Sequence, residues 1–298
     1  RKRWQVITSL TVFLLLAIYA AAPALRSAVT ATPAVTIGAK TFTEQFILSR
    51  ILATRIQNAT GLPVRTLDSL GSTVIFDALV SGQIDAYVDY SGTVWSTILH
   101  REGSGGTRQQ LLKEVESALR EQYGVRIVAA LGFENTYALA MRRSRAERMG
   151  IRTIADLARH APNLRIGGDY EFFQRLEWRS LVDTYGLQFG ETRTMDPSLL
   201  YQAARAGQTD VISAYSTDGR LAAYSLLPLE DNRGAIPPYD AVILVSRSFA
   251  EQYPEAIEVL RLLQGSIRAE KMREMNAAVG ERGESPESVA RTFLATLE

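Results

Sequence analysis

The chain has 298 residues, of which 46% are hydrophobic and 22% charged, and its formal net charge is +1. This length allows one large domain or two lobes, each with a buried core. The absence of cysteine excludes a disulfide framework, a cysteine nucleophile and a cysteine-based zinc site, and two histidines leave little material for a histidine metal centre. The nearly neutral charge gives no reason to expect nucleic acid as a partner. A binding protein remains, or an enzyme that uses carboxylates, lysine and tyrosine.

The first residues differ in character from the rest. Basic residues at positions 1–3 precede an apolar run over 6–25, and small residues follow at 29–31. This order predicts a secretory signal peptide over residues 1–31. An uncleaved membrane anchor is the alternative, because about 20 apolar residues can span a bilayer; Pro23 and the polar residues near position 9 favour cleavage. Either segment exports the remainder, so we expect a periplasmic or otherwise extracytoplasmic body.

The body begins with an alternation of strands and helices. Residues 35–38 predict a strand, and the apolar side chains that follow recur at the spacing of an amphipathic helix. They are Phe42, Phe46, Ile47, Ile51 and Leu52. The sequence Gly-Leu-Pro at 61–63 ends this helix. A strand over 64–67, a helix over 74–79 that ends at Ser81-Gly82 and a strand over 86–88 continue the pattern, which is typical of parallel α/β units.

Three pairs of segments repeat in the same order along the chain. Gly-Gln-x-Asp occurs at 82–85 and at 207–210, and aligning the two places Tyr90 on Tyr215. Strands that end in glycine turns at 36–38 and 165–167 form the second pair. Tyr137 and Tyr239, each at the entry to an apolar strand, form the third. Chance repetition at helix–strand turns is the alternative, but the shared order favours two similar lobes.

We therefore expect an α/β protein with two lobes joined by two crossover strands. Lobe 1 takes residues 34–136 and 239–298, and lobe 2 takes 137–238. Amphipathic helices over 249–263 and 266–279 are expected to pack onto lobe 1. Open parallel sheets bind ligands at the carboxyl ends of their strands, so the expected site lies in the cleft between the lobes.

Four tyrosines occupy equivalent places in the predicted repeat: Tyr90, Tyr137, Tyr215 and Tyr239. Converging tyrosine rings suit a quaternary ammonium, which has no N–H to donate and is attracted to ring faces. Other tyrosines are expected to serve in packing, among them Tyr19, Tyr123, Tyr185, Tyr201 and Tyr253.

A second group of residues could hold an anion. Lys40 and Arg175 each lie where the first strand of a lobe leads into its first helix, and Thr41 and Thr43 offer capping hydroxyls there. Helix N-termini favour anions, so Lys40, Arg175 and Thr93 could together bind a carboxylate. The alternative is that both cations are solvated surface charges. A cation box beside a carboxylate clamp suits a zwitterion.

Several motifs resemble the quaternary-amine substrate-binding proteins of ABC importers, the glycine betaine/carnitine/choline family. They are Ile37-Gly38-Ala39-Lys40-Thr41-Phe42-Thr43-Glu44-Gln45, Tyr90-Ser91-Gly92-Thr93, Asn135-Thr136-Tyr137-Ala138-Leu139, Glu171-Phe172-Phe173-Gln174-Arg175, Tyr215-Ser216-Thr217-Asp218-Gly219 and Pro237-Pro238-Tyr239-Asp240. The resemblance implies a bilobal type II periplasmic-binding-protein fold that closes on its ligand. It also implies a cage formed by the four tyrosines and carboxylate contacts at Lys40, Thr93 and Arg175. The chain departs from the pattern in lacking a lipoprotein cysteine and in carrying Glu177-Trp178 where many relatives have an Asp-Gly turn.

The expected function is an extracytoplasmic receptor that delivers glycine betaine or a related osmoprotectant to an ABC permease, as a monomer without cofactor or metal. The alternative is a ligand-sensing ectodomain or a binding domain fused to a permease. An enzyme, such as a hydrolase of choline derivatives, is disfavoured because the sequence has no Gly-x-Ser-x-Gly elbow, phosphate loop or metal-ligand spacing. Turn and capping roles explain the acidic residues near the cleft, which are Asp85, Asp89, Asp210 and Asp218.

Overall fold

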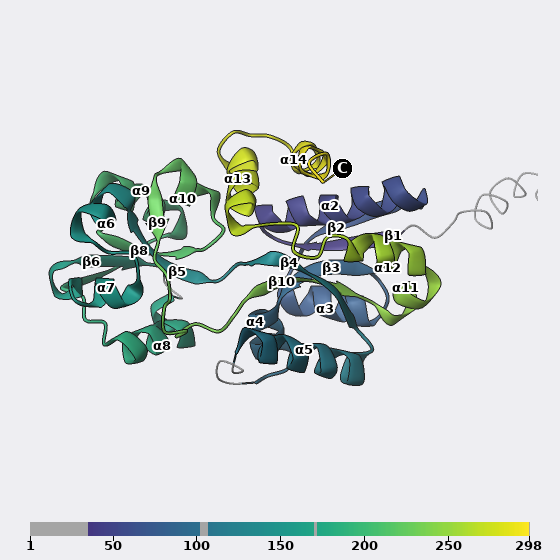
Figure 1. Cartoon of the computed structure of the whole chain (residues 1–298), viewed down its shortest axis with the longest axis horizontal. Coiled ribbons are helices and arrows are strands. Elements are labelled where there is room, and N and C mark those ends of the chain that lie inside the picture. Colours follow the sequence, from purple (N-terminus) through teal and green to yellow (C-terminus); the bar gives the residue numbers. More distant parts are fainter. Residues whose placement is uncertain (1–34, 102–106, 170–171, 298) are drawn as a thin grey trace, which may run out of the picture.

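The computed structural model describes residues 35–101, 107–169 and 172–297. In this part the chain forms two α/β lobes that lie next to each other (Figure 1). The predicted signal peptide or anchor over 1–31 lies outside the described residues. Within the described ranges, no helix combines the length and the apolar character that a membrane span requires.

The first sheet has the strand order β2-β1-β3-β10-β4. Its strands are β1 (Val35–Lys40), β2 (Val64–Leu70), β3 (Ala86–Tyr90), β4 (Arg126–Glu134) and β10 (Asp240–Val245). Strand β1 is parallel to β2 and β3, whereas β10 is antiparallel to β3 and β4. The helices of this lobe are α2 (Thr43–Thr60), α3 (Ser72–Val80), α4 (Ser91–Thr93), the π-helix η1 (Val94–Ile98), α5 (Arg108–Tyr123), α11 (Arg247–Gln252), α12 (Pro254–Arg261), α13 (Ala269–Gly280) and α14 (Pro286–Leu294).

The second sheet repeats this pattern with the order β7-β6-β8-β5-β9. Its strands are β5 (Tyr137–Arg142), β6 (Arg165–Gly168), β7 (Glu191–Thr194), β8 (Val211–Tyr215) and β9 (Leu226–Pro228). Around it lie α6 (Arg143–Met149), α7 (Ile154–Ala158), the short 3-10 helices η2 (Ala161–Asn163) and η3 (Phe172–Gln174), α8 (Leu176–Tyr185), α9 (Pro197–Ala206) and α10 (Gly219–Ala223). Strand β6 is parallel to β7 and β8, and β5 is antiparallel to β8 and β9. The predicted repeat is therefore real: β1 corresponds to β6, β3 to β8, and β10 to β5.

The chain passes between the sheets twice, from β4 to β5 and from β9 to β10 (Figure 1). The first sheet takes its strands from residues 35–134 and 240–245, and the second from 137–228. We propose that the lobes follow this division, with lobe 1 over 34–136 and 239–298 and lobe 2 over 137–238.

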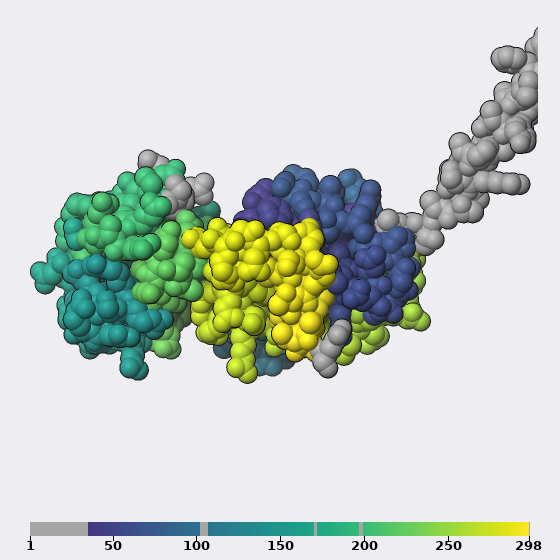
Figure 2. Space-filling view, turned by 90° about the horizontal axis from the view of Figure 1, so that it is seen from above, coloured from purple at the N-terminus to yellow at the C-terminus, as the bar shows by residue number. Residues whose placement is uncertain are grey.

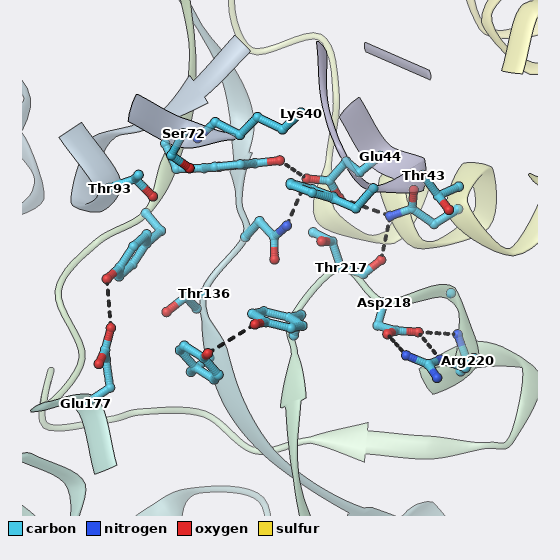
Figure 3. Close-up of a pocket in the computed structure, with 18 of the residues that line it drawn as sticks. Lys40, Thr43, Glu44, Ser72, Thr93, Thr136, Glu177, Thr217, Asp218 and Arg220 are labelled. Carbon is cyan, nitrogen blue, oxygen red and sulfur yellow. Dashed lines mark hydrogen bonds and ion pairs between the residues drawn. The ribbon is translucent and has the colours of Figure 1, made fainter. Parts of the chain in front are cut away.

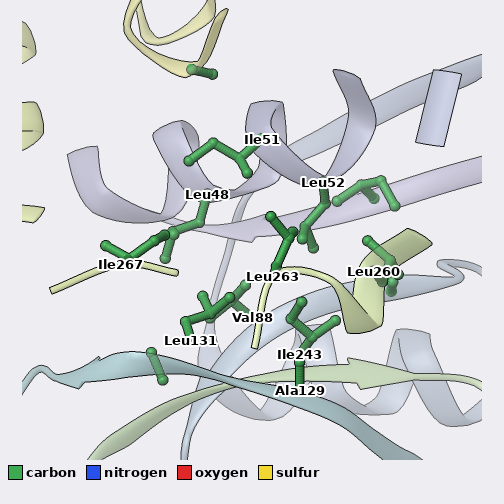
Figure 4. Packing of buried hydrophobic residues seen from close by; sticks show 14 of the residues in the cluster. Leu48, Ile51, Leu52, Val88, Ala129, Leu131, Ile243, Leu260, Leu263 and Ile267 are labelled. Atoms are coloured by element: carbon green, nitrogen blue, oxygen red, sulfur yellow. The ribbon is translucent and has the colours of Figure 1, made fainter. Parts of the chain in front are cut away.

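The core of lobe 1 follows from the alternation of side chains along its strands. In β10, Ala241, Ile243 and Val245 face α2 and the C-terminal helices, whereas Val242 and Leu244 face α3 and α5. Figure 4 shows the first of these two clusters, in which Leu48, Ile51 and Leu52 of α2 meet the sheet. Both faces are covered, so the strand ends remain as the place for a site.

Helix α2 differs from its prediction at the N-terminus. Phe42 was expected on its buried face, but the backbone of Phe42 is extended, the helix begins at Thr43, and the Phe42 ring is 38% exposed. Phe46 is only partly buried. No threonine hydroxyl caps the helix, so the expected capping role of Thr41 and Thr43 is wrong. At the other end Gly61 closes the helix in the left-handed conformation, as predicted.

The C-terminal helices were expected on lobe 1 alone, and this prediction is incomplete for α13. Helix α13 packs against α2 of lobe 1 and also against α10 of lobe 2. A Cβ on Gly219 of α10 would lie 2.4 Å from the backbone nitrogen of Ala277, so the two helices approach closely. Arg273 of α13 donates to the carbonyl oxygen of Ser216 at 2.8 Å. Figure 2 shows the C-terminal residues, in yellow, against both lobes.

Candidate functional site: the pocket between the lobes

A pocket of about 820 Å³ lies between the lobes, at the carboxyl ends of β1, β3 and β8 (Figure 3). Its lining comes from both lobes and both crossovers. All seven residues predicted for the site line it: Lys40, Tyr90, Thr93, Tyr137, Arg175, Tyr215 and Tyr239. The structure thus brings the predicted residues together, and the role of each in binding remains a prediction.

Tyr90 ends β3 and is 4% exposed. Its hydroxyl donates to Glu44 Oε1 at 2.5 Å and accepts from Gln45 Nε2 at 3.2 Å. The Phe42 ring stacks on the Tyr90 ring with 6.3 Å between centroids. Burial, and the carboxylate of Glu44, raise the pKa of Tyr90 well above its usual range. Tyr90 is therefore held in one position as a neutral phenol.

Tyr137 and Tyr215 face each other across the antiparallel pair of β5 and β8. Their hydroxyl oxygens are 3.0 Å apart and their ring centroids 4.9 Å apart. Tyr215 is 44% exposed, whereas Tyr137 is buried. The guanidinium carbon of Arg175 lies 5.3 Å from the centroid of the Tyr137 ring. This ring therefore already attracts a cation of the protein itself.

Tyr239 lies on the second crossover, directly before β10, and connects the lobes. Its ring packs on the backbone of Gly92 in lobe 1, where an added Cβ would lie 2.8 Å from three ring atoms. Its hydroxyl donates to Glu177 Oε1 of lobe 2 at 3.0 Å. Burial first, and then Glu177, raise the pKa of Tyr239. Glu177 is the residue at which the sequence departs from the family pattern, so this departure reaches the pocket.

The predicted carboxylate clamp has an unexpected feature at Lys40. Lys40 is 4% exposed and forms an ion pair with the fully buried Asp89. Asp89 also accepts from the Tyr87 hydroxyl and from the backbone N–H of Tyr90, each at 2.7 Å. Lys40 is thus a buried, balanced charge at the edge of the pocket, and Asp89 anchors it. Each cation lies over a pocket tyrosine, Lys40 at 5.6 Å from the centroid of Tyr90 and Arg175 at 5.3 Å from that of Tyr137, but Arg175, at the N-terminus of α8, is exposed.

Glu44 is a pocket residue that sequence reasoning missed. It is 2% exposed and accepts hydrogen bonds from Tyr90, from Asn135 Nδ2 at 3.1 Å and from Asn276 Nδ2 at 3.0 Å. Asn276 also donates to the carbonyl oxygen of Thr217 in lobe 2 at 2.8 Å. Burial raises the pKa of Glu44 above its ordinary value, and these hydrogen bonds oppose the rise. An acidic residue in the first turn of a helix is usually solvated, so nothing in the sequence pattern indicated that Glu44 turns inward.

The pocket is richer in negative than in positive charge. Its lining holds four acidic residues, Glu44, Glu177, Asp218 and Glu281, and three basic residues, Lys40, Arg175 and Arg220. Lys40 is balanced by Asp89, and Arg220 forms an ion pair with Asp218 at 2.7 Å. Within the described part of the chain, three buried oxygens of lining residues have no hydrogen-bond partner: Asn135 Oδ1, Thr136 Oγ1 and Asn276 Oδ1. The pocket therefore suits a positively charged group.

Two lobes of the same strand order, with a pocket where their strand ends meet, define a bilobal solute-binding protein. A model of the substrate-binding domain of ABC-type glycine betaine transport systems matches residues 33–296, and the chain belongs to this family. The chain is 30% identical over 262 residues to the carnitine transport binding protein OpuCC of Listeria monocytogenes, covering 87% of this chain and 85% of that protein.

A second relative is longer than this chain. The ergothioneine transport permease/ergothioneine binding protein EgtU of Helicobacter pylori is 30% identical over 301 residues, which cover all of this chain and 54% of that protein. The chain thus spans about half the length of EgtU.

Solved structures share the fold. A crystal structure described as a glycine betaine/carnitine/choline ABC transporter has a TM-score of 0.83 at 30% identity and covers 88% of this chain and 98% of its own. Apo YehZ of Escherichia coli has a TM-score of 0.78 at 25% identity and covers 89% and 99%. The bilobal binding-protein fold expected from the sequence is confirmed.

Proposed function

We propose that the protein captures a quaternary ammonium compound, such as glycine betaine, choline or carnitine, in the pocket between its lobes. The observation that carries this proposal is that four tyrosines from both lobes and the crossovers line one pocket with more acidic than basic residues: Tyr90, Tyr137, Tyr215 and Tyr239. Each desolvated contact between a cation and a ring contributes about 1–2 kcal/mol. Three or four such contacts support micromolar affinity after the cost of association.

The ligand's methyl groups would meet rings and oxygens. A trimethylammonium group cannot donate an N–H bond, but its polarised C–H groups attract oxygen acceptors of the lining, such as the Tyr215 hydroxyl. A carboxylate on the ligand would bind Arg175, with Thr93 as a neutral donor nearby. Because Lys40 is buried in its ion pair with Asp89 whereas Arg175 is exposed at the pocket, Arg175 is the main determinant of affinity for a zwitterion in this proposal.

Closure of the lobes would follow from contacts on both sides of the pocket. A ligand that touches lobe 1 and lobe 2 together favours the closed form by its differential affinity. We propose that this form is delivered to an ABC permease outside the cytoplasm, and that the binding protein acts as a monomer without chemical turnover of its ligand.

One observation favours a second possibility, in which the chain is part of a longer protein. The whole chain, including residues outside the described part, aligns with a relative that is named both permease and binding protein. We propose as the alternative that this chain is the binding domain of such a fused protein. Ergothioneine, which that relative is named for, then joins the list of candidate ligands.

Calorimetric titration of the chain with glycine betaine, choline, carnitine, proline betaine and ergothioneine tests the proposal. We expect saturable binding of at least one of them near the micromolar range. Failure of all five to bind at millimolar concentration would overturn it. The variant Y215A, at the most exposed of the four rings, should weaken binding at least about tenfold with little change in melting temperature.

A further inference from the structure

We propose that Glu44 and Glu177 are positioning residues that make the pocket select a cation over a neutral molecule of the same shape, each by accepting a hydrogen bond from the hydroxyl of a pocket tyrosine. This inference rests on the proposed function and names the groups behind its selectivity. Glu44 acts on Tyr90 and Glu177 acts on Tyr239.

The two glutamates occupy corresponding places in the two lobes (Figure 3), although their tyrosine partners do not. Glu44 lies in the first turn of α2, which follows β1, and Glu177 lies in the first turn of α8, which follows the corresponding strand β6. The N-terminus of a helix stabilises a carboxylate by its dipole. Each lobe therefore places a carboxylate at a helix N-terminus next to the hydroxyl of a different pocket tyrosine.

A hydrogen bond from the tyrosine hydroxyl to a carboxylate changes how strongly the ring attracts a cation. A phenol that donates to an anion gains electron density, and the anion itself attracts a cation at the ring face across a short, partly desolvated distance. A neutral tert-butyl group fills the same space and gains neither effect. The preference for a cation over a neutral molecule of the same shape should therefore be larger than four rings without carboxylate partners would give.

The surroundings of Glu44 accommodate its ionised form. Glu44 accepts hydrogen bonds from the Tyr90 hydroxyl, from the amide nitrogens of Asn135 and Asn276, and from the side chain of Thr217. A carboxylate uses only acceptors, whereas a protonated acid would bring a donor into this set. The cluster is thus built around a negative charge.

Glu177 also fixes the geometry of Tyr239. The ring is confined on one side by the backbone of Gly92, and the 3.0 Å hydrogen bond holds its hydroxyl on the side of lobe 2. Glu177 is only partly buried, so its replacement by glutamine leaves the core of lobe 2 intact.

The test compares choline with 3,3-dimethylbutan-1-ol, in which carbon replaces the quaternary nitrogen. Dissociation constants for both are measured by calorimetry or competition on wild type, E44Q, E177Q and the control E281Q. Glu281 lines the same pocket, but within the described part of the chain its carboxylate makes no hydrogen bond to a tyrosine. We expect E44Q and E177Q each to lower the preference for choline about tenfold, and E281Q to lower it less than about threefold.

A double-mutant cycle separates this mechanism from simple loss of structure. Y239F removes the hydroxyl through which Glu177 acts, so the double variant Y239F/E177Q should lose no more choline affinity than the weaker-binding single variant. Additive losses, or equal weakening of both ligands in E177Q, would overturn the inference. If E44Q fails to fold, E177Q and the cycle still decide.

The outcomes distinguish this inference from the proposed function. If the wild type binds no quaternary ammonium compound, the proposed function fails. If it binds choline but E177Q retains the full preference over the neutral alcohol, the function stands and the role of the carboxylate is refuted.

Discussion

Replacing Gly92 by alanine tests whether the close packing of Tyr239 shapes the pocket. The new Cβ would lie 2.8 Å from three atoms of the Tyr239 ring, whereas carbon atoms in contact prefer about 3.5–4.0 Å. The ring must therefore move by about 1 Å. A movement of that size breaks the 3.0 Å hydrogen bond from Tyr239 to Glu177.

The cost can be divided between folding and binding. Overpacking costs about 1–3 kcal/mol of stability. Displacing one ring removes a contact worth about 1–2 kcal/mol to a bound cation, which corresponds to a loss of affinity of about 5- to 30-fold. We expect G92A to remain folded and to bind a quaternary ammonium ligand within this range of weakening.

Urea denaturation measures the first quantity and calorimetric titration the second. Gly71, at the N-cap of α3, is the matched control, because an added Cβ there meets nothing within 4 Å and its φ of −71° suits any residue. G71A should bind the ligand as wild type does, and its loss of stability should not exceed about 1 kcal/mol, the cost of alanine as a poorer N-cap than glycine. Wild-type affinity in G92A would refute the reasoning that Tyr239 is positioned by this contact.

Three further predictions concern the charged residues. R175A should weaken glycine betaine at least about tenfold more than choline, because only betaine carries the anion; equal losses in calorimetry would remove the carboxylate clamp. Choline affinity should fall as the pH drops through the pKa of Glu44, which burial holds above 4.5, since protonation removes a negative charge from the pocket. The fall in choline affinity should be smaller in E44Q than in wild type. Identical profiles of affinity against pH for the two proteins would contradict this prediction. D89N should lower the free energy of unfolding, measured by urea denaturation, by about 3–5 kcal/mol, because Lys40 is left buried without its partner. The double variant K40M/D89N should recover part of this loss. A loss below about 1 kcal/mol in D89N would show that Asp89 does not anchor Lys40.

The repeat in the sequence predicted the arrangement of the site because equivalent local patterns mark equivalent strands in the two lobes. Aligning Tyr90 with Tyr215 placed both at the ends of corresponding strands, β3 and β8, and the structure confirms this correspondence. Tyr137 and Tyr239 likewise enter the corresponding antiparallel strands β5 and β10. Residues at corresponding strand ends converge once the two sheets face each other, so the four tyrosines of the lining could be predicted from the repeat.

Contacts between distant segments were not accessible in this way. Glu44 turns inward because Asn135 and Asn276 supply donors from a crossover and from α13, and no local pattern links these positions. The pairing of Lys40 with Asp89 joins the ends of two strands whose neighbours are known only after the sheet is assembled. The position of α13 against both lobes depends on the missing side chain at Gly219, which in sequence is simply the residue after an Asp.

The interrupted strand order of lobe 1 has a consequence for folding during synthesis. Strand β10 lies between β3 and β4, so these two strands have no partner on their shared side until residue 245 has left the ribosome. The sheet of lobe 2 is drawn from 137–228 alone and can assemble earlier. The half of the molecule that begins first therefore finishes last, and during that interval it exposes strand edges of the kind that chaperones protect.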